Sequence, residues 1–393
     1  MKILFWLSIG LDRRTPSEHL LTAIVEALYK QGHTVHILQK DTCGSKANLT
    51  PLMEKLGVTT SVVVTKPPKK NNFIARFLSD VIYVRACKKW FKKNRDFDRV
   101  FMQSSNVAGL QILELKKYLK DISVTFNVQD IFPENAAYCG SISRGGMVYK
   151  ILSSMQRRAY RRVDKVITIS EDMKAQLVEL GVPSDKVEVV YNWSYRDTPY
   201  DLSELDYSRV APLFDGDKFN VVYAGNIGMM QNVELVVRAA ARMVEHTDIA
   251  FHIFGDGLYK NKLVALAEEL GAGNLTFHKM LDSADAPALY GSADLNVIPL
   301  GEKIYRTALP SKTATCLATG KPVALCIGKE SEFGRKMSES FGVKLLSAND
   351  ADELAEAVLA VRENRGARLN TADFEKYFSL SANSGRYGEI IVN

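Results

Sequence analysis

Two short segments in the second half of the chain combine residue types that could bind a phosphate group. The first, VVYAGNIGMMQN (221–232), ends an apolar run in two glycines, Gly225 and Gly228, and enters a helical pattern. A turn of this kind places backbone N–H groups and the positive end of a helix against an anion. The segment contains no Lys or Arg. A positive charge must therefore come from another part of the chain.

The second segment supplies a candidate for that charge. Lys312 follows Pro310 and Ser311 at the start of the helical pattern TATCLATG. A lysine is unfavourable at a helix N-terminus, because the helix dipole is positive there, so its presence favours an anionic partner. Arg306 is a second, weaker cation nearby. The alternative is that Lys312 is a surface lysine that pairs with an acid of another domain.

The hydrophobic pattern predicts the elements that must position these residues. Apolar strands alternate with helical patterns, which is typical of parallel sheets covered on both faces. In the first half, strands are predicted near 2–7, 33–38, 60–64, 98–102, 122–126 and 165–169, with helices near 17–31, 73–94, 106–118, 145–162 and 171–180. In the second half, strands are predicted near 219–224, 249–254, 274–278, 293–298, 322–326 and 343–346, with helices near 232–245, 259–270, 310–318 and 350–363.

The expected fold class is therefore α/β, with two doubly wound, Rossmann-like domains. A polar stretch over 197–218 is the expected linker, so that the domains span 1–196 and 197–373. A chain of 393 residues is long enough for two cores. Ligands of doubly wound sheets bind outside the carboxyl ends of the strands, so the expected site is a cleft between the domains.

Composition and charge exclude several classes of protein. Hydrophobic residues make up 46% of the chain and charged residues 24%, as in ordinary globular proteins. The five cysteines are scattered without a C-x-x-C pair, which indicates reduced thiols and no zinc site. The apolar start MKILFWLSIGLDRR is too short to span a membrane and lacks a small-residue cleavage site. A cytoplasmic protein is expected.

Basic residues concentrate in the first half of the chain. Between Lys66 and Arg99 there are eleven Lys or Arg and three Asp, a local charge of 11 − 3 = +8 against +6 for the whole chain. A second cluster contains Arg157, Arg158, Arg161, Arg162 and Lys165. The first half is therefore expected to face an anionic partner: a membrane surface, a lipid phosphate or nucleic acid.

Several segments, taken in order, resemble a known family. They are Gly32-His33 with Val35, VITISEDM (166–173), VEVVYN (187–192), VVYAGNIG (221–228), IFGDG (253–257), SADLNVIP (292–299) and LPSKTATCLATGKPV (309–323). Together they resemble the retaining bacterial glycosyltransferases of family 4, which have the GT-B fold. VQDIFPENA (128–136) is similar to the D-[IL]-[WFY]-P-E segment of the subgroup that builds surface polysaccharides.

This resemblance implies transfer of a sugar from a nucleotide sugar, expected to be UDP-linked, to an acceptor hydroxyl with retention at the anomeric carbon. The donor would bind to the second domain and the acceptor to the first, without a metal or a cofactor. The acceptor would be a saccharide linked to a polyprenyl diphosphate, as a precursor of capsule, O-antigen or exopolysaccharide. The last segment, 374–393, would cross back onto the first domain.

The resemblance also assigns donor contacts and shows where this chain departs from the family. The assigned residues are Gly10, Gly225, Asn226, Gly228, Gly255, Thr307, Leu309, Pro310, Ser311 and Thr315. Many members have an Arg at the position of Asn226 and a Lys near Gln231, and two glutamates where Thr307 and Thr315 stand. Thr307 or Glu302 is the expected substitute for the missing sugar contact. A variant donor site is therefore expected.

Carboxylates in the first half are the candidates for acceptor chemistry. Asp130 lies at a predicted strand end, where it could orient or deprotonate the acceptor hydroxyl, or cap the turn at Pro133. Glu134 could approach the acceptor or cap a helix. Asp96 and Asp98 match the D-x-D spacing of metal-dependent glycosyltransferases, but they lie in a basic helix-end context where acids cap and solvate. No metal site is expected.

The segment FIARFLSDVIYVRACKKWFKKN (73–94) suggests how the protein reaches a lipid-linked acceptor. Phe77, Val81, Val84 and Phe91 fall on one helical face, and Lys88, Lys89, Lys92 and Lys93 lie largely off it. This pattern predicts peripheral attachment to an anionic membrane, at the inner face of the cell membrane. The alternative is a core-facing helix with a solvated basic side. No base-reading motif accompanies the cluster, so nucleic acid is not an expected partner.

Two other classes of function remain open. The missing Arg, Lys and glutamates would suit a non-catalytic glycosyltransferase-like scaffold subunit. A sugar-nucleotide epimerase can share the GT-B fold, but it needs acid and base side chains in the cleft, of which the sequence offers few. A nucleotide-sugar turnover assay discriminates the three functions.

Overall fold

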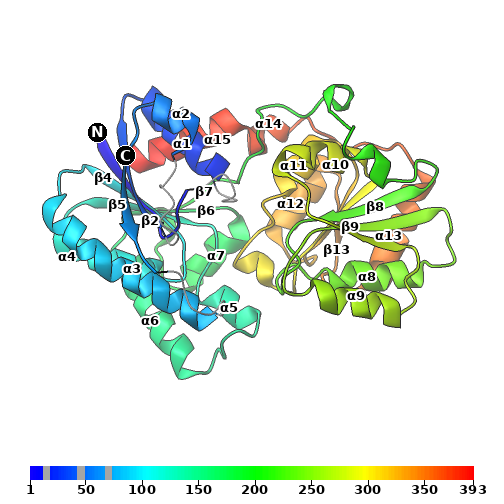
Figure 1. Cartoon of the computed structure of the whole chain (residues 1–393), viewed down its shortest axis with the longest axis horizontal. Helices are drawn as coiled ribbons and strands as arrows, with labels where there is room; N and C mark the ends of the chain where they lie inside the picture. The colour runs from blue at the N-terminus through cyan, green and yellow to red at the C-terminus, as the bar shows by residue number, and fades with distance from the viewer. Residues whose placement is uncertain (12–17, 42–48, 67–72) are drawn as a thin grey trace. The chain divides into compact units, whose positions relative to one another are not determined.

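The computed structural model describes residues 1–11, 18–41, 49–66 and 73–393, and its contacts divide them into two compact units (Figure 1). Unit 1 contains Met1–Asn192 and Leu380–Asn393, and unit 2 contains Trp193–Ser379. The sequence-based boundaries were 1–196, 197–373 and 374–393. Cys43 and the two lysines at 69 and 70 lie outside the described residues.

Unit 1 is built on a seven-stranded parallel sheet with the order β3-β2-β1-β4-β5-β6-β7. The strands are β1 (Lys2–Trp6), β2 (Thr34–Asp41), β3 (Thr59–Val64), β4 (Arg99–Gln103), β5 (Ser123–Val128), β6 (Lys165–Thr168) and β7 (Val187–Val189). The order runs outward in both directions from β1 and β4, as in a doubly wound sheet. The predicted α/β fold class is confirmed.

Helices cover both faces of this sheet (Figure 1). One face carries α1 (Glu18–Lys30), α2 (Pro51–Lys55) and the C-terminal α15 (Leu380–Val392), which packs against α1. The other face carries α3 (Phe73–Lys93), α4 (Ala108–Tyr118) and α6 (Met147–Tyr160), with α4 packed between its two neighbours. The short α5 (Glu134–Tyr138), α7 (Glu171–Glu179) and the 3₁₀ turn η1 (Ser184–Lys186) complete the unit.

Unit 2 is built on a six-stranded parallel sheet with the order β10-β9-β8-β11-β12-β13. The strands are β8 (Phe219–Ala224), β9 (Ile249–Phe254), β10 (Leu275–His278), β11 (Leu295–Pro299), β12 (Val323–Cys326) and β13 (Lys344–Leu346). One face carries α10 (Ala286–Ser292), α11 (Thr313–Ala318) and α12 (Glu332–Phe341). The other carries α8 (Glu234–Arg242), α9 (Lys260–Glu269) and α13 (Ala351–Glu363) (Figure 1). The short α14 (Phe374–Phe378) also belongs to unit 2.

Burial explains why the central strands form where they do. All six residues of β8 are buried, because a parallel strand covered by helices on both sides is apolar on both faces. The side chains of Val221, Tyr223 and Ile253 join the helices α8 and α13 in one hydrophobic cluster. The carboxyl ends of these strands are therefore held rigidly, and the loops that follow them start from fixed positions.

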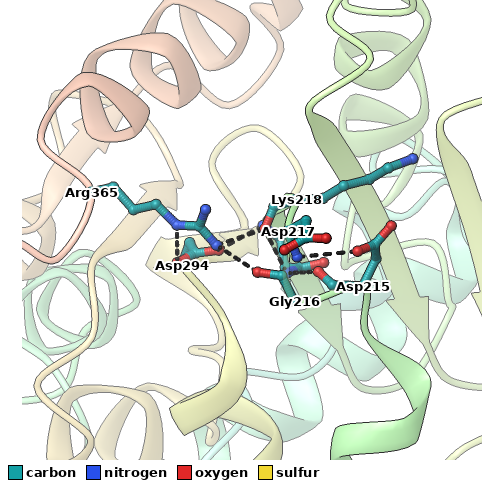
Figure 2. A network of polar contacts seen from close by, with 7 residues as sticks. Asp215, Gly216, Asp217, Lys218, Asp294 and Arg365 are labelled. Carbon is teal, nitrogen blue, oxygen red and sulfur yellow. Dashed lines mark hydrogen bonds and ion pairs between the residues drawn. The ribbon is translucent and has the colours of Figure 1, made fainter.

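A polar network fixes the start of β8 at the opposite, amino-terminal edge of the same sheet (Figure 2). Arg365 follows α13 in the chain. Its guanidinium group donates to both carboxylate oxygens of Asp294 at 3.3 Å and to the Lys218 carbonyl at 2.7 Å. Asp294 in turn accepts a hydrogen bond from the Asn220 backbone at 2.8 Å. The network ties the polar linker to the strand that leads to the candidate site.

Helix α3 corrects one sequence-based prediction. Val84 and Phe91, which were predicted to face a membrane, are buried, and Phe77 and Val81 are partly buried. This face packs in unit 1, as the alternative interpretation held. Among the α3 side chains that the structure describes, the large apolar ones that are exposed are instead Leu78 and Ile82.

Candidate active site

The Lys312 amine lies at the carboxyl end of β8. Lys312 immediately precedes α11, and its Nζ donates a hydrogen bond of 2.6 Å to the carbonyl of Ala224, the last residue of β8. The same nitrogen lies 3.7 Å from the centroid of the Tyr223 ring, within the range of a cation–π interaction. A strand end and an aromatic face therefore hold the ammonium group in place.

The electrostatic state of Lys312 is unusual for a lysine. The side chain is half-buried, and the loss of hydration around the amine lowers the pKa of Lys312 to about 7. In the part of the chain that the structure describes, no carboxylate forms a salt bridge with it. Lys312 therefore gains stabilisation from any anion that approaches the end of β8. Because α11 has only six residues, the lysine rather than the helix dipole supplies the charge.

Gly225 allows the Lys312 amine to lie close to the backbone at the end of β8. It has a φ of +147°, and a Cβ at this position would lie 3.0 Å from the Lys312 Nζ. Gly255, which follows β9, is buried, and a Cβ there would collide with the Gly225 carbonyl. The glycines of both loops therefore serve the close packing of strand ends. Gly255 in particular has a structural explanation that needs no ligand.

The N–H groups of the glycine turn are mostly occupied. The Gly225 N–H donates to the Phe254 carbonyl at 2.9 Å, and the Ile227 N–H donates to the Asp256 carbonyl at 2.8 Å. The Gly228 N–H donates to the Gln231 side-chain oxygen at 3.1 Å. An anion could reach the Gly228 N–H only after the Gln231 side chain moves away.

The remaining predicted donor residues of unit 2 lie in different environments. Asn226 is exposed, and its side-chain amide donates to the Gln231 oxygen at 3.3 Å. Thr307 is fully buried, and its hydroxyl donates to the Ile304 carbonyl at 3.1 Å. Thr315 is buried within α11. Leu309 and Pro310 are half-buried, Ser311 is exposed, and Arg306 is half-buried in the 3₁₀ turn η5 (Ile304–Arg306). The two threonines do not present their hydroxyls to solvent as the missing glutamates would.

Two further residues, Tyr223 and Lys260, belong to this site but were not predicted from the sequence. Tyr223 supplies the ring beneath Lys312, and its hydroxyl donates to the Asn226 carbonyl at 2.6 Å. The Lys260 amine donates to the carbonyls of Gly255 and His278 at 2.9 and 3.0 Å, and so ties the ends of β9 and β10 together. An aromatic residue near the end of a fully buried strand carries no periodic signal. Only its place beside the glycine turn could have singled out Tyr223.

In unit 1, Asp130 lies beyond the carboxyl end of β5. The Ser104 hydroxyl accepts hydrogen bonds from the N–H groups of Gln129 and Asp130, at 3.0 and 3.2 Å. The residue is exposed, yet loss of hydration beside the surrounding protein raises the pKa of its carboxyl to about 6. Among the described residues, no group donates a hydrogen bond to this carboxylate, and α5 has no side-chain cap. The geometry therefore gives no sign that Asp130 caps the turn at Pro133.

The loop that carries Asp130 is braced from the C-terminal helix. The Gln129 amide donates to the Asn127 side chain at 3.1 Å and to the Tyr387 hydroxyl at 3.3 Å, and it accepts from Asn192 at 2.7 Å. Tyr387 belongs to α15, and its hydroxyl also donates to Asn127 at 3.1 Å. Three side chains from three parts of unit 1 thus restrict Gln129, the residue next to Asp130.

Glu134 is placed differently from Asp130. It is only 2% exposed, and burial raises the pKa of its carboxyl. The Tyr149 hydroxyl donates to one of its oxygens at 3.1 Å, while the other has no partner among the described residues. The carboxylate therefore lies under the surface of the predicted acceptor region. In this arrangement Glu134 does not meet an acceptor directly.

Two further predicted positions lie in unit 1. Gly10 follows β1, and a Cβ there would lie 2.7 Å from the Lys40 carbonyl, so close backbone packing requires a glycine. Of the four lysines on α3, Lys88 lies 3.5 Å from the Glu114 carboxylate, whereas Lys89, Lys92 and Lys93 are exposed. Across the described part of the chain, no helix combines the length and apolar character needed to cross a bilayer.

Comparisons with known protein families assign both units. The model of Glycosyltransferase Family 4 matches residues 17–193, and the model of Glycosyl transferases group 1 matches residues 218–364. The chain is a family 4 glycosyltransferase. The first match falls on unit 1 and the second on unit 2, so together they span nearly the whole chain. The predicted family is confirmed.

Two relatives of this family 4 glycosyltransferase come from Pseudomonas aeruginosa and Escherichia coli. WbjE of Pseudomonas aeruginosa, named as a glycosyltransferase, is 23% identical over 69% of this chain and 68% of its own length. WcaI of Escherichia coli K12, named as a colanic acid biosynthesis glycosyl transferase, is 27% identical over 57% of each chain. The alignments thus span about two thirds of the first relative and little more than half of the second.

Solved structures of glycosyltransferases share the GT-B fold of this chain. HepE of Anabaena, crystallised with UDP and glucose, aligns over 100% of both chains with a TM-score of 0.71 and 17% identity. WaaG, a glycosyltransferase involved in lipopolysaccharide biosynthesis, aligns over 100% of both chains with a TM-score of 0.67 and 15% identity. At these identities the likeness supports the fold.

Proposed function

We propose that this family 4 glycosyltransferase transfers a sugar from a UDP-sugar to a saccharide on a polyprenyl diphosphate, with retention at the anomeric carbon. The observation that carries the proposal is the Lys312 ammonium group, held at the carboxyl end of β8 without a carboxylate partner among the described residues. A diphosphate is the anion that a nucleotide sugar would bring there. The UDP bound in the fold neighbour HepE supports the choice of nucleotide.

In this reaction the protein mainly positions the donor and the acceptor and supplies positive charge. As the bond between the anomeric carbon and the diphosphate oxygen breaks, negative charge grows on the departing phosphate. The acceptor oxygen bonds to the anomeric carbon on the same face, and its proton passes to the phosphate oxygen that leaves. Lys312 stabilises the growing charge, most strongly where water is excluded. The reaction needs no metal or cofactor in this proposal.

Asp130 is the proposed acceptor residue. Its carboxylate is exposed at the carboxyl edge of the unit 1 sheet, on a loop that Ser104 and the Gln129 network restrict. A carboxylate there accepts the hydrogen bond of an acceptor hydroxyl and fixes its direction of attack. Glu134 remains a structural residue in this proposal, because it is buried beneath the loop.

The proposed location of the enzyme is an anionic membrane surface. Helices α3 and α6 lie on the same face of the unit 1 sheet, on either side of α4 (Figure 1). The first halves of the two helices carry large apolar side chains that are more than half exposed: Leu78, Ile82, Met147, Val148 and Ile151. Their second halves and the residues that follow carry exposed cations: Lys89, Lys92, Lys93, Arg158, Arg161 and Arg162.

This arrangement suits a membrane because the two helices have the same polarity. Both connect parallel strands, so both begin near the carboxyl edge of the sheet and end near its amino edge. The exposed apolar side chains thus gather toward the edge that carries Asp130. Each basic residue near an anionic leaflet contributes about 1 kcal/mol, an attraction that salt weakens.

A radiolabelled turnover assay tests the proposed function. Purified protein is incubated with UDP-sugars and a polyprenyl diphosphate saccharide fraction. Release of UDP that depends on the lipid, with label in the lipid product, is the expected result. Interconversion of the sugar nucleotide without transfer would favour an epimerase. Absence of any turnover by folded protein across all donors would favour a scaffold subunit.

Vesicle flotation tests the proposed location. A variant with Leu78, Ile82 and Ile151 changed to Ser is expected to lose about tenfold in binding to phosphatidylglycerol vesicles, because it loses apolar area that would be buried in the interface. The matched control changes Leu258, an exposed leucine of unit 2, to Ser. Equal binding by both variants would contradict the proposed surface.

A further inference from the structure

A second concentration of positive charge lies at the amino-terminal edge of the unit 1 sheet, where β5, β6 and β7 begin. A cavity of about 430 Å³ opens there, lined by Lys116, Lys120, Arg161, Arg162, Val163, Asp164 and Lys186. Five of its seven lining residues are cations and one is an anion, so the net charge is 5 − 1 = +4. The cations come from the end of α4, the turn after α6 and η1.

Two of the cations are built into the wall of the cavity. The Lys116 side chain is only 13% exposed, and its amine donates to the Ile122 carbonyl at 2.7 Å. The Lys186 amine donates to the Val163 carbonyl at 3.2 Å. Carbonyl groups orient these amines without neutralising them. Each ammonium group has three N–H donors and retains some of them for a ligand.

The single acid of the cavity does not balance this charge. Asp164 accepts a hydrogen bond from the Val124 backbone at 2.9 Å, and its carboxylate lies 3.6 Å from the Lys116 amine. Among the described residues, no carboxylate forms a salt bridge with Lys120, Arg161, Arg162 or Lys186. Several cations converge here at a cost in mutual repulsion, which a bound anion would relieve.

We propose that this cavity binds a phosphate or diphosphate group. Two arginines supply planar pairs of donors that match phosphate oxygens, and the three lysines supply point charges. The volume falls within the usual range for small-ligand sites, so the group can belong to a larger molecule. This site is separate from the Lys312 site and does not depend on the transferase proposal, because it lies at the opposite type of edge in the other unit.

The phosphate can come from a lipid head group or from a soluble phosphate ester. The cavity adjoins the basic ends of α4 and α6, on the face of the sheet with the exposed apolar side chains. That position suits the head group of an anionic lipid. A soluble phosphate ester would use the same donors, and the experiment separates the two sources.

The test is calorimetric titration with inorganic pyrophosphate. All proteins carry Lys312→Ala, so that the donor site does not contribute. One variant adds Lys120→Gln, Arg161→Gln and Arg162→Gln, and its matched control adds Lys89→Gln, Lys92→Gln and Lys93→Gln on α3. Both variants lose three charges from exposed positions, so both are expected to fold, which circular dichroism checks. The cavity variant is expected to raise Kd at least tenfold and the α3 control less than twofold.

Equal weakening in both variants would show that only net charge matters and would overturn the site. Failure of the Lys312→Ala parent protein to bind millimolar pyrophosphate would overturn it as well. If phosphatidylglycerol vesicles displace pyrophosphate and phosphatidylcholine vesicles do not, the site takes a lipid head group. If neither displaces it while the cavity variant still loses binding, the site takes a soluble phosphate ester.

Discussion

The two sites use positive charge in opposite ways. At the end of β8 a single half-buried lysine is held by one carbonyl and one aromatic ring, and burial lowers its pKa to about 7. At the amino edge of unit 1, five cations line one cavity, and three of them are exposed. The first site thus has its positive charge on one partly desolvated nitrogen, whereas the second has its charge on several groups, most of them in contact with water.

This difference determines what each site can do. A partly desolvated charge interacts strongly with a group at one position, which suits the stabilisation of a charge that develops during a reaction. Exposed charges attract anions over a longer range, but salt screens them and no single one is decisive. Chemistry is therefore expected at Lys312 and attachment at the cavity.

Removal of Lys312 should have the largest effect. Lys312→Ala is expected to reduce turnover by about a hundredfold or more, because one cation at a developing phosphate charge lowers the barrier by several kcal/mol. Lys312→Arg should recover only part, since a planar fork does not replace a point charge. Steady-state kinetics on folded variants measure this. Turnover at the level of the unchanged protein in Lys312→Ala would mean that another group carries the charge.

The next largest effect is a difference between the two sites in how strongly salt weakens ligand binding. Between 50 and 500 mM NaCl, pyrophosphate binding at the cavity is expected to weaken by about tenfold or more, because exposed charges lose most of their attraction. UDP binding at Lys312 is expected to weaken by only about threefold, since the half-buried amine is less screened. Calorimetric titrations in both salts compare the slopes. A steeper salt dependence for UDP would contradict the distinction.

Asp130 offers a test on the acceptor side. Asp130→Asn is expected to lower turnover about tenfold by loss of acceptor orientation. Loss of hydration raises the pKa of this carboxyl to about 6. The charged form dominates above that pH, so acceptor kcat/KM should fall as the pH drops through about 6. In Asp130→Asn this acid limb should vanish. An unchanged acid limb would assign it to a different group.

The smallest expected effect concerns the ring under Lys312. Tyr223→Phe keeps the aromatic face and removes the hydroxyl that donates to the Asn226 carbonyl at 2.6 Å. Loss of one buried hydrogen bond of this kind costs about 1 kcal/mol. Donor affinity is expected to fall at most about fivefold as the glycine turn loosens, with turnover at saturating donor nearly unchanged. A loss as large as that of Lys312→Ala would give the hydroxyl a role in the chemistry.

The sequence predicts the architecture of this protein well, because buried parallel strands and amphipathic helices leave strong patterns. The predicted strand over 219–224 coincides with β8. The exceptions have local causes. β7 has only three residues, too few to show a pattern. α12 contains Gly334, which the hydrophobic pattern does not favour in a helix, but a Cβ there would lie 2.6 Å from a Leu345 methyl group.

The site was less predictable than the fold, since it depends on which side chains turn inward. Lys312 was recognisable because a lysine at a helix start is unusual. Helix α3 has apolar side chains on two faces. The hydrophobic periodicity of the sequence does not show which face is buried, so it does not predict that Val84 is buried and Leu78 is exposed. The hydrogen bond from Gly228 to Gln231 likewise depends on a side-chain position that no spacing records.

The central claim, that the Lys312 cation meets the diphosphate, is tested most directly by proton uptake on UDP binding. A pKa of about 7 leaves most of the free amine neutral at pH 8, and a bound diphosphate would restore its charge. Calorimetry in buffers of different ionisation enthalpy is therefore expected to show uptake of about 0.9 proton at pH 8 and about 0.1 from Lys312 at pH 6. Lys312→Arg, which stays charged, should bind UDP without this extra uptake at pH 8. Equal proton uptake by the unchanged protein and Lys312→Arg would contradict the claim.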